Sequence, residues 1–279
     1  MGSNVSVAHI NSSAAIRDMV RIGKLDLTYI PSNMTTNSQE EISQFLTNRW
    51  IYETVLAPAQ HLLVFQTDSM LCANSRQSIN DWLEYDWVGA PWSPNGKWGG
   101  NGGLSLRKVS AIIDVLKNQV RSDKVPEDVW LAERLAHRPG AKMANGTASL
   151  TFSGEMHGGE VVKISPHVPE EEGREKHEAG GGIDSDATDA EAAAVDVWRD
   201  GFYEPMGYHT GDNGRTMHSA IWGTPEMRSH IWKYCPEVKM IFEMDAADYV
   251  SLYHTLHNSG SWLTLSGSLG HATRMCVRF

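Results

Sequence analysis

The chain has 279 residues, of which 41% are hydrophobic, and it carries a formal net charge of −10. This composition is that of a globular protein with one large core, and no apolar run is long enough to cross a bilayer. Ten acidic and two basic residues between Glu170 and Asp196 supply −8 of the charge, so the remainder is nearly neutral. Nucleic-acid binding requires a concentrated basic surface, so we expect no nucleic-acid partner and no transmembrane segment in this chain.

The first predicted elements are a short strand over residues 25–30 and a helix that follows Ser38. Ser38 and Glu41 form a capping box ahead of apolar residues at helical spacing. Residues 62–65 are an apolar run that ends at the polar segment 66–69, a pattern typical of a buried central strand. We expect the carboxyl end of this strand to face a site.

Two more strands are predicted at residues 87–90 and 103–106, the second after a glycine-rich loop. Apolar residues at helical spacing over 109–120 predict a helix. Residues 126–128, Pro-Glu-Asp, open another helix with a proline and two acids in its first turn. Strands that alternate with helices predict an α/β fold, in which ligands bind beyond the carboxyl ends of strands.

Composition divides the chain into a core and two additions. Residues 158–197 are rich in Glu, Asp, Ala and Gly with hardly an aromatic side chain, which predicts a disordered acidic insertion. We therefore expect the core to comprise residues 1–157 and 198–242, with a C-terminal extension at 243–279.

Three cysteines, Cys72, Cys235 and Cys276, are scattered without metal-ligand spacing. Their odd number argues against a disulfide framework, and their spacing does not indicate a structural zinc site. The first residues lack the charged start and apolar stretch of a signal peptide, so we expect no signal peptide or membrane anchor in this chain.

Asp68 and His209 are candidate metal ligands. A carboxylate at a strand end and a neutral imidazole nitrogen can hold a divalent cation against a diphosphate. Equally, Asp68 can cap a turn, and His209 can be an ordinary partly buried histidine. Both interpretations stay open at this stage.

The glycine-rich loop and two neighbouring tryptophans are candidate substrate contacts. Glycines let a ligand approach the backbone closely, and indole faces pack on the apolar face of a sugar ring. The tryptophans at 82 and 87 are expected in the core instead. The predicted substrate-binding residues are Trp92, Trp98, Asn101, Gly102 and Gly103.

Asp128, with Glu127 beside it, is a candidate catalytic base that removes a proton from an acceptor hydroxyl. The alternative is that both acids simply complement the dipole at the start of a helix. From position alone, the second interpretation is the commoner one.

Five segments, at residues 65–69, 85–91, 101–107, 127–130 and 205–209, include the motifs Gln-Thr-Asp, Asn-Gly-Gly-Leu-Ser-Leu, Glu-Asp-Val and Pro-Met-Gly-Tyr-His. In this order they closely resemble a fungal family of domains of unknown function that is regarded as glycosyltransferase-like. The similarity runs over residues 37–242, apart from the insertion. The order also resembles GT-A glycosyltransferases of the β-1,3-galactosyltransferase and fringe kind.

This resemblance implies a GT-A-like (Rossmann-like) mixed sheet flanked by helices. It implies inverting transfer of a sugar from a nucleotide-sugar donor to a glycan or other hydroxyl acceptor, with Asp68 and His209 as ligands of Mn²⁺ or Mg²⁺. Asp128 would be the base. Related transferases work in the Golgi, which implies the secretory pathway.

Two departures from the family pattern keep alternatives open. The Gln66-Thr67-Asp68 segment has one carboxylate where the usual motif has two, and the N-terminal nucleotide-binding part is expected to be incomplete. The main alternative is a catalytically inactive, truncated relative that acts as a carbohydrate-binding or interaction module. A third is a glycosidase, which needs Asp68 and Asp128 at a suitable separation.

Overall fold

The computed structural model describes residues 2–96, 98–122, 124–158, 198–199, 201–210, 217–241 and 275–278. The acidic insertion predicted at 158–197 lies outside the described residues from position 159 onward. The C-terminal extension predicted at 243–279 also lies outside them, apart from residues 275–278.

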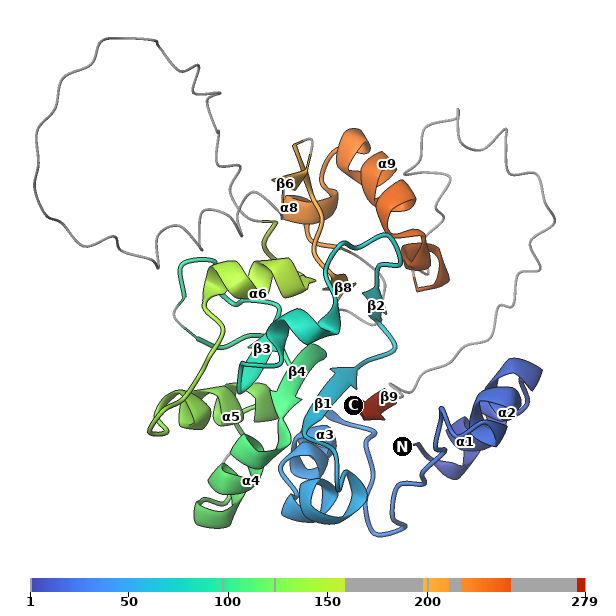
Figure 1. The fold of residues 1–279 in the computed structure, drawn as a ribbon, viewed down its shortest axis with the longest axis vertical. Helices are drawn as coiled ribbons and strands as arrows, with labels where there is room; N and C mark the ends of the chain where they lie inside the picture. The colour runs from blue at the N-terminus through green and yellow to red at the C-terminus, as the bar shows by residue number, and fades with distance from the viewer. Residues whose placement is uncertain are drawn as a thin grey trace, which may run out of the picture.

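A four-stranded sheet forms the centre of the molecule, with strand order β3-β4-β1-β9 (Figure 1). All its neighbouring strands are antiparallel, so Phe65 pairs with Leu104 and the carboxyl end of β1 lies beside the amino end of β4. The strands predicted at 62–65, 87–90 and 103–106 are confirmed as β1, β3 and β4. The bounds are β1 (His61–Phe65), β3 (Trp87–Gly89), β4 (Leu104–Lys108) and β9 (Met275–Arg278).

Helices cover one face of this sheet. Leu62 and Val64 belong to the core cluster on that face, whereas Leu63 belongs to a second cluster on the opposite face, as strand alternation requires. The predicted helix after Ser38 is confirmed, and the Ser38 side chain accepts a hydrogen bond from the backbone N–H of Glu41. The elements here are α3 (Gln39–Leu46), the π-helix η1 (Ile51–Val55), α4 (Val109–Asn118) and α5 (Glu127–Ala136).

A second, three-stranded sheet with order β2-β8-β5 lies next to the first and packs against α8 and α9 (Figure 1). Strand β8 is antiparallel to β2 and parallel to β5. Its bounds are β2 (Ser69–Leu71), β5 (Ser153–Gly154) and β8 (Gly207–His209), and the surrounding elements are η2 (Ile79–Trp82), α6 (Gly146–Phe152), β6 (Trp198–Arg199), β7 (Phe202–Tyr203), α8 (Ser219–Trp222), α9 (Pro225–Tyr234) and η4 (Pro236–Met240). The α/β class is therefore confirmed.

Two expectations from the sequence are wrong. Residues 25–30 form no strand beyond an isolated bridge between Tyr29 and Gly2, because no described strand pairs with them. Cys72 and Cys235 form a disulfide although they lie 163 residues apart, so the odd count of cysteines was a poor guide. This bond joins the end of β2 to the end of α9.

The N-terminal helices α1 (Asn4–Ile10) and α2 (Ala14–Arg21) stand beside the central sheet (Figure 1). Among the helices that the structure describes, none has the length and apolarity needed to span a membrane.

Candidate functional site

Strand pairing brings Asp68 and His209 together. Asp68 lies in the turn between β1 and β2, and His209 ends β8, where it pairs with Ser69. Both side chains are buried, and Asp68 Oδ1 lies 3.4 Å from His209 Nε2. The Thr210 backbone N–H donates to the Asp68 carbonyl at 2.9 Å, which fixes the turn against β8. Two residues that are 141 positions apart in the sequence thus lie side by side at the ends of their strands.

The glycine-rich loop reaches the same strand ends because β1 and β4 are antiparallel. The Gln66 backbone N–H donates to the Gly103 carbonyl at 2.9 Å, and the Gly103 N–H donates to Asn101 Oδ1 at 2.6 Å. Gly103 packs so closely that an added Cβ would overlap His209 Nε2 and Gln66 Oε1. The Gln66 carboxamide oxygen itself lies 3.0 Å from His209 Nε2. Glycine is therefore required at position 103 to let the loop meet the histidine.

Glu155 is a member of this cluster that the sequence did not indicate. It directly follows the two-residue strand β5, and its side chain is 15% exposed. Its Oε1 lies 3.2 Å from His209 Nδ1 and accepts from Asn101 Nδ2, also at 3.2 Å. The sequence shows only a single acidic residue at this position, and the strand before it is too short to be predicted.

His209 therefore lies between two carboxylates, one at each ring nitrogen. Burial disfavours the charged ring, but hydrogen bonds and ion pairing with Asp68 and Glu155 outweigh it and raise the pKa of His209 to about 9. The two carboxylates therefore favour the protonated ring.

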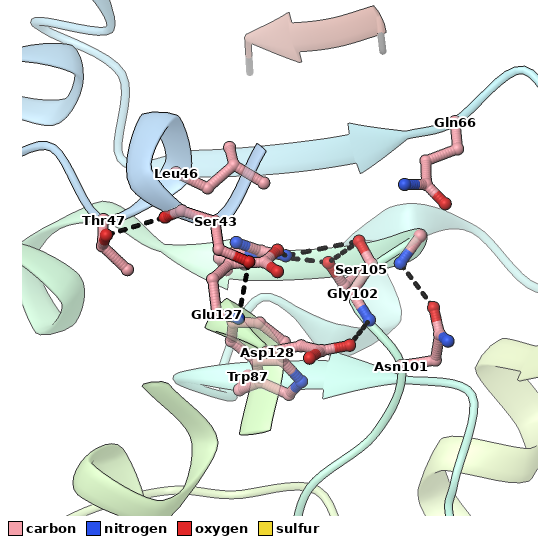
Figure 2. A network of polar contacts seen from close by, with 12 residues as sticks. Ser43, Leu46, Thr47, Gln66, Trp87, Asn101, Gly102, Ser105, Glu127 and Asp128 are labelled. Atoms are coloured by element: carbon pink, nitrogen blue, oxygen red, sulfur yellow. Dashed lines mark hydrogen bonds and ion pairs between the residues drawn. The ribbon is translucent and has the colours of Figure 1, made fainter. Parts of the chain in front are cut away.

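Asp128 joins the cluster through the loop (Figure 2). Its Oδ2 accepts from the Gly102 N–H at 2.9 Å, and its Oδ1 accepts from its neighbour Val129 N–H at 2.8 Å. Burial and the adjacent charge of Glu127 raise the pKa of Asp128. A carboxylate with a raised pKa is a better proton acceptor, which suits a general base.

Glu127, expected beside Asp128 as a catalytic residue, lies behind the site. It is 3% exposed and pairs with the fully buried Arg107 of β4 at 2.9 Å. The Ser43 hydroxyl of α3 accepts from the Glu127 backbone N–H at 3.2 Å. Arg107 in turn donates to the Gly102 carbonyl at 3.3 Å, so the buried pair holds the loop in place; Glu127 and Gly102 are labelled in Figure 2.

The two candidate tryptophans lie in different places. Trp92 is 36% exposed, and its ring packs against Gly99 within the glycine-rich loop. Trp98 is 41% exposed and makes an edge contact with His137, at the opposite end of α5 from Asp128. The loop residue Asn101 is fixed separately, because its backbone N–H donates to the Ala90 carbonyl.

The donor set around His209 fits a cation on one side of the ring. Asp68 Oδ1 and Gln66 Oε1 both face Nε2, and bonds of about 2.1 Å to nitrogen and oxygen are compatible with a separation of 3.4 Å. Glu155 faces the other ring edge. Within the described part of the chain, no three histidine, cysteine, aspartate or glutamate side chains gather around one ion, so the described residues would leave coordination positions open to water or phosphate oxygens.

Two surface hollows lie away from this cluster. One, of about 200 Å³, is bordered by β7, α8 and α9, and another, of about 460 Å³, lies near η1 and the start of α4. Neither is lined by Asp68, Asp128 or His209. We place the candidate site at the cluster because the titratable groups meet there.

The fold and the cluster define a mixed α/β protein whose two sheets gather acidic, glycine and histidine residues at a shared edge. The chain belongs to the family described as protein of unknown function DUF5672, which matches residues 24–169, more than half of its length. The matched region contains Asp68, the loop, Asp128 and Glu155, whereas His209 lies beyond it. No curated protein and no solved structure matches the chain.

Proposed function

We propose that this chain transfers a sugar from a nucleotide-sugar donor to a hydroxyl acceptor on a GT-A-like scaffold, with inversion at the anomeric carbon. One observation carries the proposal: Asp68, the loop at 101–103, Asp128 and His209 meet through direct contacts. The same four segments carry the resemblance to glycosyltransferases in the sequence.

Asp128 is the proposed base. Each carboxylate oxygen has a second lone pair besides the one that its backbone N–H engages, so Asp128 can still accept a proton. As the acceptor hydroxyl oxygen bonds to the anomeric carbon, its proton passes to Asp128 and the bond to the diphosphate breaks. Trp92 and Asn101 would contact the acceptor.

Asp68 and His209 Nε2 would hold a divalent cation, Mn²⁺ or Mg²⁺, with Gln66 beside them. Such a cation supplies positive charge to the departing diphosphate. The buried disulfide between Cys72 and Cys235 supports an oxidising compartment, in agreement with the secretory pathway expected from the resemblance.

The test combines calorimetry and hydrolysis. UDP and GDP are titrated into the protein with and without Mn²⁺, and a panel of nucleotide sugars is screened for hydrolysis. We expect Mn²⁺-dependent nucleotide binding that Asp68→Asn abolishes, and turnover that Asp128→Asn abolishes without loss of binding. Glu84→Gln is the control, because Glu84 is exposed and pairs only loosely with Lys142 at 3.8 Å.

Nucleotide binding without turnover in any combination would favour the inactive binding module. Absence of nucleotide binding under every condition would refute the transferase.

A further inference from the structure

One carboxylate oxygen connects the two halves of the proposed site. Glu155 Oε1 contacts both Nδ1 of the proposed cation ligand His209, on the ring edge away from the cation, and Asn101 Nδ2 in the loop. Asn101 and His209 are each 54 residues from Glu155 in the sequence. Glu155 therefore links two segments that are 108 residues apart in the sequence.

On the histidine, this contact decides which nitrogen is available. A carboxylate 3.2 Å from Nδ1 favours a proton on that nitrogen, so that the Nε2 lone pair is the one offered to a cation. Nε2 is also the atom that faces Asp68 and Gln66. Glu155 therefore favours one tautomer of the ring, and its contact with Nδ1 adds to those of Asp68 and Gln66 with Nε2 in orienting it.

On the loop, the same oxygen decides how the Asn101 carboxamide is turned. With Nδ2 donating to Glu155, Oδ1 is left to accept from the Gly103 N–H at 2.6 Å. That bond holds Gly103 against His209, where a side chain would not fit. A rotated carboxamide would place its NH₂ group against the Gly103 N–H and open the loop.

We propose that Glu155 is a positioning residue that aligns the cation ligand His209 with the acceptor loop through Asn101. The inference deepens the proposed function and rests on it for the cation and the acceptor. Glu155 neither binds the cation nor removes a proton. Through these two contacts, Glu155 couples the orientation of the His209 ring to that of the Asn101 carboxamide.

The test uses the full chain and compares wild type with Glu155→Ala, Glu155→Gln and the control Glu133→Ala, whose side chain is 56% exposed on α5. Mn²⁺ affinity is measured by calorimetry. Loss of an outer carboxylate on a metal-bound histidine costs about 10- to 100-fold in metal affinity. We expect that loss in Glu155→Ala, a smaller one in Glu155→Gln, which keeps an acceptor oxygen, and none in the control.

A second readout does not depend on the cation. In metal-free protein labelled with ¹⁵N, the Nδ1–H resonance of His209 should shift in both Glu155 variants, and the Gly103 amide resonance should move with it. Circular dichroism verifies that the variants are folded, and Glu155→Gln serves if the alanine variant is not.

The outcomes separate the two proposals. If wild type binds no Mn²⁺, the cation part of the proposed function fails, while the two resonances still test Glu155. If the His209 and Gly103 resonances of folded Glu155 variants coincide with those of wild type, the positioning role is overturned whatever the metal does.

Discussion

The buried pair of Arg107 and Glu127 gives the sharpest stability prediction. Replacing Glu127 with alanine leaves the Arg107 guanidinium fully buried, with the neutral acceptors Ser105 Oγ at 3.0 Å and the Gly102 carbonyl at 3.3 Å. The face of Trp87, 4.1 Å from the guanidinium carbon, adds only a weak attraction. An uncompensated buried charge costs about 3–5 kcal/mol, and the nearby Asp128 carboxylate offsets part of this, so we expect Glu127→Ala to lower the free energy of unfolding by about 3 kcal/mol.

Two further variants separate charge from shape. Glu127→Gln keeps an oxygen that can accept from Arg107, so its cost should be about 2 kcal/mol, the value of a charged hydrogen bond. The double variant Arg107→Met with Glu127→Leu removes both charges and should recover most of the loss.

Urea unfolding followed by tryptophan fluorescence and circular dichroism measures these differences, provided that the slope with denaturant is unchanged. Glu133→Ala is the matched control on the same helix, because its pair with Arg134 is exposed and should contribute less than about 1 kcal/mol. A loss below about 1 kcal/mol in Glu127→Ala would show that Arg107 is solvated or paired otherwise, and the reasoning would fail.

Three other predictions concern the site and its surroundings. Gly103→Ala introduces a Cβ that overlaps His209 and Gln66. Urea unfolding should therefore show a free energy of unfolding lower by about 1–3 kcal/mol, and Mn²⁺ titration should show a weaker affinity. An unchanged affinity would argue against close packing of the loop. Reduction of the Cys72–Cys235 disulfide should destabilise the protein by about 2–5 kcal/mol, seen as a lower Tm in reductant, whereas equal Tm values would contradict the bond. The pKa of His209 is raised from 6.5 to about 9, so the charged ring stabilises the metal-free protein by about 3 kcal/mol below pH 6.5, and this contribution is lost as the pH rises through 9. Unfolding of His209→Gln should therefore show a flatter pH profile between 6.5 and 9, and parallel profiles for the two proteins would refute the assignment.

The elements that formed as predicted are those with a strong local signal. The apolar residues of β1 pack against a core cluster on each face of the sheet. Ser38 and Pro126 mark the starts of two helices, and such signals depend only on residues nearby in the sequence. The segment 25–30 has a similar alternation but no partner strand, and a strand needs a partner to satisfy its backbone groups.

The site was harder to read because its contacts depend on short strands. Asp68 and His209 meet through β2 and β8, each three residues long, and Glu155 enters through the two-residue β5. Strands this short carry no periodicity, so the proximity of Asp68 and His209 was expected from resemblance, and Glu155 was not expected at all. The burial of Glu127 could not be predicted either, because its partner Arg107 lies in a segment whose other residues predict an apolar strand.

The disulfide also has a consequence for the covalent connectivity of the chain. Cys72 and Cys235 enclose residues 73–234 in a ring, and that ring contains the whole acidic segment between Glu170 and Asp196. A single backbone cleavage inside the segment would leave the two pieces linked, with Asp68 on one piece and His209 on the other. Such a nicked protein would still run as one species until a reductant separates its halves.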